Sequence, residues 1–295
     1  MHQNATARPS ASKTAVSKPV RRKSAAARPV PAESSRPPRL LHTLLEYRAL
    51  LEIGLLPPLL PLLQLTPRGD GHPVLLVPGF TATDATLIGL RVFLRSLGHH
   101  VETWGLGQNT GFQRKFTRAL EQKVRYLHHR HGRKVSLVGW SLGGVYAFST
   151  AHSAPECVRS VISLGSPMRV SPGNIGVPLL VRALYRYFAH PMGPVAHVAN
   201  VRAKLLQSPP PLPSTCIYSA TDGVVPAQAA QLDGDPRLHE NVWVPGSHVG
   251  LGFNAAVMWV LADRLAQREG HWQPFRPHGW LGSLYERRAA AALKP

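Results

Sequence analysis

A serine between glycines is the residue with the clearest potential for chemistry. The run G-W-S-L-G-G at residues 139–144 matches the pattern G-x-S-x-G, between a predicted strand at 135–138 and a predicted helix. A serine on such a tight strand-to-helix turn projects its hydroxyl above the sheet edge, and Gly139 and Gly143 provide the small neighbours that the turn needs. The N-terminus of the helix offers N–H groups and positive potential to a developing oxyanion. We therefore predict that Ser141 is a nucleophile.

A serine hydroxyl needs a base, and the base needs a carboxylate that orients it. In a strand–turn–helix setting of this kind the chain order is serine, acid, histidine. Asp222 lies just beyond the predicted strand 216–219, and His248 directly follows the predicted strand 242–244. We predict a triad of Ser141, Asp222 and His248. The alternatives are an Asp-Gly turn without a catalytic role and an ordinary loop histidine.

Two backbone N–H groups are expected to form an oxyanion hole. One belongs to Leu142, the residue after the predicted nucleophile. The other is expected in the loop after the first strand, in Val77-Pro78-Gly79-Phe80, and Phe80 is our choice. Gly79 would let this backbone approach the substrate closely.

The elements that must position these residues are short apolar strands that alternate with amphipathic helices. This pattern predicts an α/β fold with a mostly parallel sheet flanked by helices. Between the fourth and fifth predicted strands, residues 167–213 carry no strand signal, and we interpret them as an inserted cap. Trp140, Tyr185 and Tyr187 are candidate substrate-binding residues, with packing of the cap as the alternative for the tyrosines. The six predicted strands are 74–77, 100–104, 135–138, 158–164, 216–219 and 242–244.

With these motifs in place, residues 72–267 resemble the α/β-hydrolase superfamily, and within it the lipase/esterase-like proteins. The resemblance implies the fold, the same triad, hydrolysis of carboxylic esters and no cofactor. Pro78 stands where many relatives carry the histidine of a His-Gly pair, and Trp140 replaces the more frequent histidine. Neither change removes a backbone donor, but the substrate cannot be taken from any one relative. The resemblance rests on residues 78–80, 139–144, 164–167, 222–223 and 246–248.

The N-terminal 70 residues lie outside the resemblance. Residues 1–38 are basic, contain no apolar run and are predicted to form a disordered tail. Residues 39–70 form an apolar helical segment, in which Pro57, Pro58 and Pro61 are expected to break the helix. The stretch Ile53–Thr66 is uncharged but too short to cross a bilayer, so we expect the segment to pack on the main domain. Contact of residues 1–65 with a lipid surface is the alternative. The main domain is assigned to 71–268 and a C-terminal extension to 269–295.

The charge balance sets limits on partners and location. The chain has 34 Lys+Arg against 15 Asp+Glu, which favours non-specific contact with anionic polymers or lipid. The sequence contains no basic segment interleaved with aromatic residues, the pattern that would suggest specific nucleic-acid binding. His128, His129 and His131 lack the ligands that would complete a metal site, so we predict no metal. We expect a cytoplasmic protein with a small-molecule or lipid ester substrate.

Three other functions remain open at this point. An acyltransferase would use the same triad and pass the acyl group to an acceptor other than water. A lyase or peroxidase could reuse the same residues. A non-catalytic binding protein, tethered by its basic tail, would need none of them.

Overall fold

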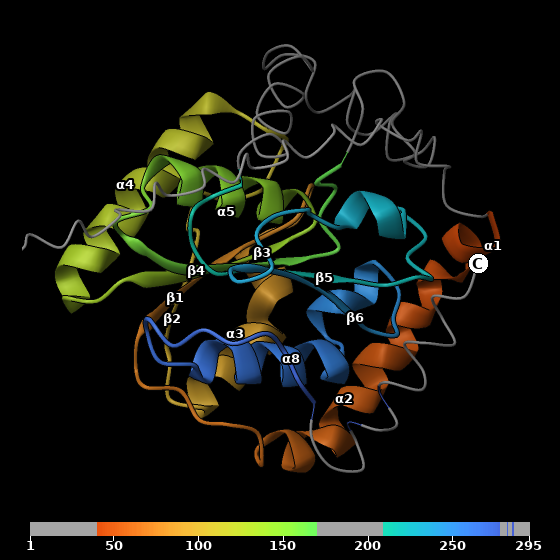
Figure 1. The fold of residues 1–295 in the computed structure, drawn as a ribbon. Coiled ribbons are helices and arrows are strands. Elements are labelled where there is room, and N and C mark those ends of the chain that lie inside the picture. Colours follow the sequence, from red (N-terminus) through yellow and green to blue (C-terminus); the bar gives the residue numbers. More distant parts are fainter. Residues whose placement is uncertain (1–39, 170–208, 278–281, 283–284, 286–295) are drawn as a thin grey trace, which may run out of the picture. The chain divides into compact units, whose positions relative to one another are not determined.

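Six parallel strands form one sheet, with the order β2-β1-β3-β4-β5-β6 (Figure 1). The structure is a computed structural model that describes residues 40–169, 209–277, 282 and 285. Because every pair is parallel, the carboxyl ends of the strands share one edge of the sheet, and loops at that edge can converge. The predicted fold class is confirmed. The strands are β1 (Pro73–Val77), β2 (His100–Thr103), β3 (Val135–Trp140), β4 (Val158–Leu164), β5 (Ser214–Tyr218) and β6 (His239–Trp243).

Helices cover both faces of the sheet, as its continuous apolar strands require. The helices α4 (Arg114–His131) and α5 (Leu142–Ser153) pack on one face, and α3 (Ile88–Ser96) and α8 (Ala255–Ala266) on the other (Figure 1). Every residue of β1, β3 and β5 is buried. α5 lies deepest, since ten of its twelve residues are buried. Short 3-10 turns complete the described fold: η2 (Asp84–Leu87), η3 (Ala227–Ala230) and η4 (Val249–Gly252).

The N-terminal segment is helical over a longer range than its prolines predict. After α1 (Leu40–Leu44) and η1 (Leu45–Arg48), α2 runs from Ala49 to Leu63 and contains all three prolines. The prediction that they break the helix is wrong. A helical proline leaves the carbonyl four residues before it without an N–H donor. Those carbonyls belong to Ile53, Gly54 and Pro57, which are exposed, so water can replace the missing donor.

Several predicted segments lie outside the residues that the structure describes. The structure does not describe the predicted tail 1–38 or most of the predicted cap, which includes Tyr185 and Tyr187. Of the C-terminal extension beyond residue 277, it describes only residues 282 and 285. In the part of the chain that the structure describes, no helix combines the length and the hydropathy that crossing a bilayer requires.

Candidate active site

Ser141 lies at the sharp turn between β3 and α5. Its backbone has φ 53° and ψ −121°, a positive-φ conformation that residues other than glycine rarely adopt. The turn is held by hydrogen bonds from the Ser141 N–H to the Leu164 carbonyl (2.8 Å) and from the Gly144 N–H to the Ser141 carbonyl (3.0 Å). The buried strand and the buried helix on either side hold this residue in its strained conformation. Strained residues maintained in this way are typical of functional sites.

Both glycines of the motif are required by close backbone packing. A methyl group on Gly139 would lie 2.3 Å from the Gly143 carbonyl oxygen. One on Gly143 would lie 2.2 Å from the carbonyl oxygen of Val77, at the end of β1. The helix N-terminus therefore approaches the first strand and the loop after it, which brings Ser141 close to that loop.

The structure brings the three predicted triad residues together at the carboxyl edge of the sheet. His248 Nε2 lies 3.0 Å from Ser141 Oγ, and His248 Nδ1 lies 2.7 Å from Asp222 Oδ2. The other carboxylate oxygen, Asp222 Oδ1, accepts hydrogen bonds from the N–H groups of Val224 (2.8 Å) and Val225 (2.7 Å). These bonds fix the carboxylate and leave one oxygen directed at the imidazole.

Burial and charge act in opposite directions on the imidazole. Burial of His248 lowers its pKa, but the negative charges of Asp222 and Glu46 and the hydrogen bond to Asp222 outweigh this effect and raise the pKa above its ordinary value. The carboxylate of Asp222 therefore stabilises the protonated ring, the form that a general base reaches after it takes a proton.

Gly165, just after β4, makes room for the acid–histidine pair. Its φ is 55°, and a methyl group there would lie 3.1 Å from Asp222 Oδ2 and 3.2 Å from His248 Nδ1. It would also lie 2.7 Å from a side-chain carbon of Leu251. A larger residue would thus be strained in its backbone and would press on the hydrogen bond between the acid and the ring.

The predicted oxyanion-hole residues belong to two segments next to Ser141. Leu142 is the first residue of α5, where N–H groups have no intrahelical acceptor. The loop that carries Phe80 passes close to Ser141, since a methyl group on Gly79 would lie 3.2 Å from Ser141 Cβ. Asn109 supports this loop, because its Nδ2 donates to the Pro78 carbonyl (2.9 Å). The roles of Phe80 and Leu142 remain predictions.

The other candidate residues have different positions. Trp140 is buried among the side chains of α3 and α8, and its Nε1 donates to the His248 carbonyl (3.1 Å). It therefore supports the histidine loop, and its contact with substrate remains a prediction. Tyr185 and Tyr187 lie outside the described residues.

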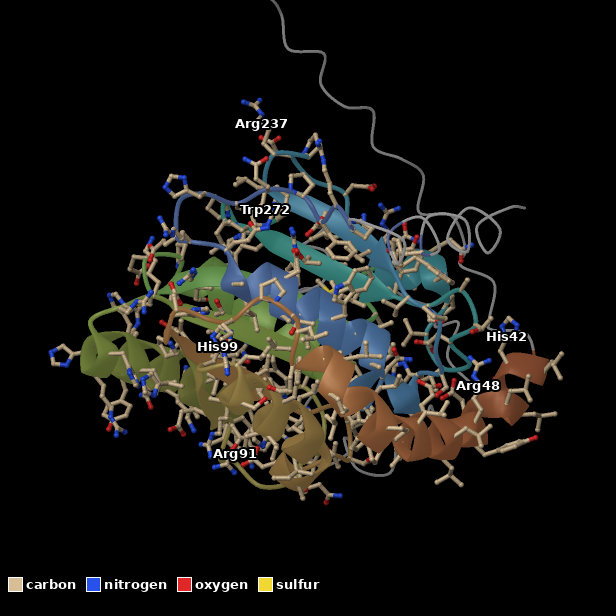
Figure 2. The ribbon with its side chains drawn as sticks, turned by 90° about the horizontal axis from the view of Figure 1, so that it is seen from below. His42, Arg48, Arg91, His99, Arg237 and Trp272 are labelled. Atoms are coloured by element: carbon tan, nitrogen blue, oxygen red, sulfur yellow. The ribbon has the colours of Figure 1, made fainter. Side chains whose placement is uncertain are left out.

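Sequence reasoning missed three charged side chains of the N-terminal segment that contact the triad loops. Glu46 accepts from the His248 N–H (3.0 Å), Arg48 donates to the Gly246 carbonyl (2.8 Å), and Glu52 accepts from the Ser247 N–H (2.8 Å). Figure 2 shows Arg48 on this helical segment. The signal in the sequence was weak: three charged residues in a run of leucines.

One group of residues has the composition of a metal site. Ligand atoms of Asp70, His72 and His99 lie within 4.8 Å of one another. However, Asp70 forms ion pairs with Arg133 and Arg159, and His72 Nδ1 lies 2.6 Å from Asp70 Oδ1. Two cations at the only carboxylate of the trio disfavour a metal ion and explain the group as an ion-pair network.

No protein-family model and no curated protein sequence matches the chain. Many solved structures resemble it, and the three described here do so at low sequence identity. Aspergillus fumigatus lipase B matches with a TM-score of 0.53 and 16% identity, over 68% of this chain and 54% of that one.

Two further structures match over most of their own length. A structure of the metagenome-derived lipolytic enzymes LipS and LipT matches with a TM-score of 0.51 and 17% identity, over 68% of this chain and 95% of that one. A soluble variant of monoglyceride lipase from Saccharomyces cerevisiae matches with a TM-score of 0.52 and 14% identity, over 68% and 88%. The parallel sheet, the strained serine turn and these likenesses together show that the chain has the α/β-hydrolase fold.

Proposed function

We propose that the protein is a serine hydrolase that cleaves carboxylic esters through an acyl-enzyme on Ser141. The observation that carries this proposal is the continuous chain of hydrogen bonds from Asp222 through His248 to Ser141 Oγ, with the serine on a strained turn. The likeness in fold to lipases and esterases supports it.

Acylation would begin with a proton transfer. Ser141 Oγ attacks the ester carbonyl carbon as His248 Nε2 takes the hydroxyl proton, and the N–H groups of Leu142 and Phe80 stabilise the resulting oxyanion. The tetrahedral intermediate then expels the alcohol, which receives the proton from His248. The products of this half-reaction are the alcohol and the acyl-enzyme.

Deacylation repeats the same steps with water. Water gives a proton to His248 Nε2 and attacks the acyl carbonyl, and collapse of the second intermediate returns that proton to Ser141 Oγ. The carboxylic acid is released, and the enzyme regains its starting state. Asp222 keeps Nδ1 protonated throughout, so that Nε2 is free to accept.

Hydrolysis of p-nitrophenyl esters of graded chain length tests the proposal. Ser141→Ala should lower kcat at least roughly 10³-fold, because the residual rate comes from binding and the oxyanion hole alone. Ser153→Ala, at the far end of α5, is the matched control and should keep the wild-type rate. Ester hydrolysis that survives Ser141→Ala would contradict the proposal.

Two of the three alternative functions give different results in the same assay. An acyltransferase would produce mainly the transferred ester when an alcohol is added, whereas a hydrolase releases mainly the acid. A binding protein would leave every ester uncleaved. The ratio of transfer to hydrolysis therefore distinguishes the acceptor, and the rate distinguishes enzyme from binding protein.

A further inference from the structure

The loops that carry Asp222 and His248 are held from outside the sheet by the N-terminal helical segment, residues 40–63. Glu46 bridges the two loops. Its Oε1 accepts from the N–H groups of Gly223 (2.7 Å) and His248 (3.0 Å), and its Oε2 accepts from the Val249 N–H (2.9 Å). One carboxylate thus fixes the residue after the acid and the backbone of the histidine itself.

Arg48 makes a second bridge between the same loops. Its Nη2 lies 2.7 Å from both the carbonyl oxygen and Oγ1 of Thr221, and 2.8 Å from the Gly246 carbonyl oxygen. Thr221 directly precedes Asp222, and Gly246 lies two residues before His248. The guanidinium therefore contacts the opposite flank of each loop.

Glu52, further along the helix, fixes the base of the histidine loop. Its Oε1 accepts from both the N–H and the Oγ of Ser247 (2.8 Å each), and its Oε2 accepts from Asn254 Nδ2 (2.8 Å). The packing around it is close, because a methyl group on Gly250 would lie 2.3 Å from Glu52 Oε2. The loop cannot shift on this side without breaking charge-assisted hydrogen bonds.

Backbone packing joins the first helical turn to the acid loop. A methyl group on Gly223 would lie 2.4 Å from the His42 carbonyl oxygen, and Thr43 Oγ1 donates to the Gly223 carbonyl (2.8 Å). Gly223 therefore serves the docking of the N-terminal segment as well as the turn after Asp222.

We propose that Glu46 and Glu52 are positioning residues of the active site, and that residues 40–63 are a required part of it. This inference rests on the proposed hydrolase function. The geometry of catalytic groups must be held to a fraction of an ångström, because small misplacements reduce the rate strongly. Here that precision comes from a segment about 200 positions away from the histidine in sequence, as the separation of 202 between Glu46 and His248 shows.

The negative charge of Glu46 acts on the imidazole in addition to the hydrogen bonds that hold the loops, and this effect can be measured separately. The groups that face or flank the imidazole are Asp222, Glu46, and at its loop Arg48 and Glu52. Burial lowers the pKa of His248, and Asp222 followed by Glu46 raises it. Removing the charge of Glu46 should therefore lower the pKa of His248, which a merely structural contact would not do.

The test is Glu46→Gln in the full-length protein. We expect kcat to fall about 10-fold with little change in KM, because the ring is less well placed for proton transfer. The acid limb of the pH–rate profile should move to lower pH, and so should the NMR titration of the His248 ring in the resting protein. Glu121→Gln, the same substitution at a partly exposed glutamate of α4 whose partner is Arg125, is the matched control and should change neither quantity.

The outcomes separate this inference from the proposed function. An inactive wild type would remove the function, but the NMR titration would still test the contact between Glu46 and His248. A wild-type kcat together with an unshifted His248 titration in Glu46→Gln would overturn the positioning role. If that variant does not fold, Glu52→Gln decides: unchanged kcat in this variant would equally overturn the inference.

The outer face of residues 40–65, away from the contacts with the triad loops, is apolar. Its large apolar side chains are exposed although the opposite side contacts the protein, and Leu50, Leu51 and Leu65 are 72%, 70% and 82% accessible. Exposed apolar surface of this extent marks an interaction site. The exposed set is Leu41, Leu44, Tyr47, Leu50, Leu51, Ile53, Leu55, Leu60, Leu62 and Leu65.

Charge indicates what covers this face. The sequence directly before it, residues 1–39, carries nine Lys/Arg and one acid, Glu33. An apolar helical face joined to a basic segment fits an anionic lipid surface, where apolar side chains enter the interface and cations meet the headgroups. We infer that residues 40–65 dock on anionic lipid, with the basic residues adding electrostatic attraction.

Co-sedimentation with vesicles tests this docking. Binding to vesicles of phosphatidylcholine with phosphatidylglycerol should exceed binding to phosphatidylcholine alone and should weaken with salt. Leu50→Ser/Leu51→Ser should reduce binding about 10-fold or more, whereas Val92→Ser, at an exposed apolar residue of α3, should not. Binding unaffected by the leucine variant would overturn the inference. So would a dimer in sedimentation velocity that the same variant dissociates, because a second copy would then cover the face.

Discussion

Asp222→Asn should inactivate the protein by fixing the wrong tautomer of His248. In the wild type, Asp222 Oδ1 accepts from the N–H groups of Val224 and Val225, and Oδ2 lies 2.7 Å from His248 Nδ1. In the variant, the two N–H groups still need an acceptor, so the amide oxygen keeps the Oδ1 position and the NH₂ group faces the ring. Nδ1 must then accept, which moves the ring proton to Nε2.

The expected loss in kcat follows from this change of tautomer. With its proton on Nε2, the ring donates toward Ser141 Oγ and cannot take the serine proton. In serine hydrolases with the corresponding substitution the loss in kcat is about 10⁴-fold, which corresponds to roughly 5.5 kcal/mol of activation free energy. KM should change little, because Asp222 is buried and contacts Nδ1, the ring nitrogen that does not contact Ser141.

The assay is steady-state hydrolysis of a p-nitrophenyl ester, with thermal unfolding to verify the fold. Asp233→Asn is the matched control, because Asp233 is an exposed acid whose partner is Arg169, and it should keep the wild-type kcat. A folded Asp222→Asn variant with kcat within about 10-fold of the wild type would refute the reasoning about the tautomer.

Three further predictions concern pH and packing. The pKa of His248 is raised, and the ring must be neutral to act as a base. As the pH is lowered, kcat/KM should therefore begin to fall at a pH above the ordinary pKa of histidine. A fall that begins at or below that pKa would contradict this prediction. Burial lowers the pKa of His99 (Figure 2) to about 4, so His99 binds a proton more readily in the unfolded chain than in the folded one. The free energy of unfolding should therefore decrease as the pH is lowered from about 6.5 toward 4. Urea unfolding of His99→Asn should therefore lose roughly 2 kcal/mol less between pH 7 and pH 5 than the wild type, and an equal loss would refute the assignment. Gly143→Ala should lower the free energy of unfolding by about 1–3 kcal/mol, because the methyl group meets the Val77 carbonyl, whereas Gly54→Ala, with open space in α2, should raise it by roughly 0.5–1 kcal/mol. Equal effects of the two substitutions would contradict the packing argument.

Much of the site could be predicted because parallel strands end at one edge. That rule points to Asp222 and His248, which follow β5 and β6, and away from His239. His239 is the first residue of β6, at the opposite edge, where its Nε2 contacts the Pro210 carbonyl (3.0 Å). The position of Ser141 followed from local pattern alone, since the turn requires glycines on both sides.

The N-terminal segment shows why the remainder could not be predicted. The contacts of Glu46 and Glu52 join residues that lie 177 to 203 positions apart, and no local periodicity encodes such pairs. The prolines also predicted an early end of the helix, because proline generally disrupts helices. That general tendency does not include the local surroundings of a particular helix. In this environment α2 is exposed on the side of its freed carbonyls, and its other side is fixed by charged hydrogen bonds to the loops.

Acylation of Ser141 is the central step of the proposed mechanism, and covalent labelling of this serine measures its reactivity directly. After treatment with a fluorophosphonate, peptide mass spectrometry should find one adduct, on Ser141, and labelling should be lost in Ser141→Ala and slowed in Asp222→Asn. An adduct on another residue, or labelling that persists in Ser141→Ala, would contradict the central claim.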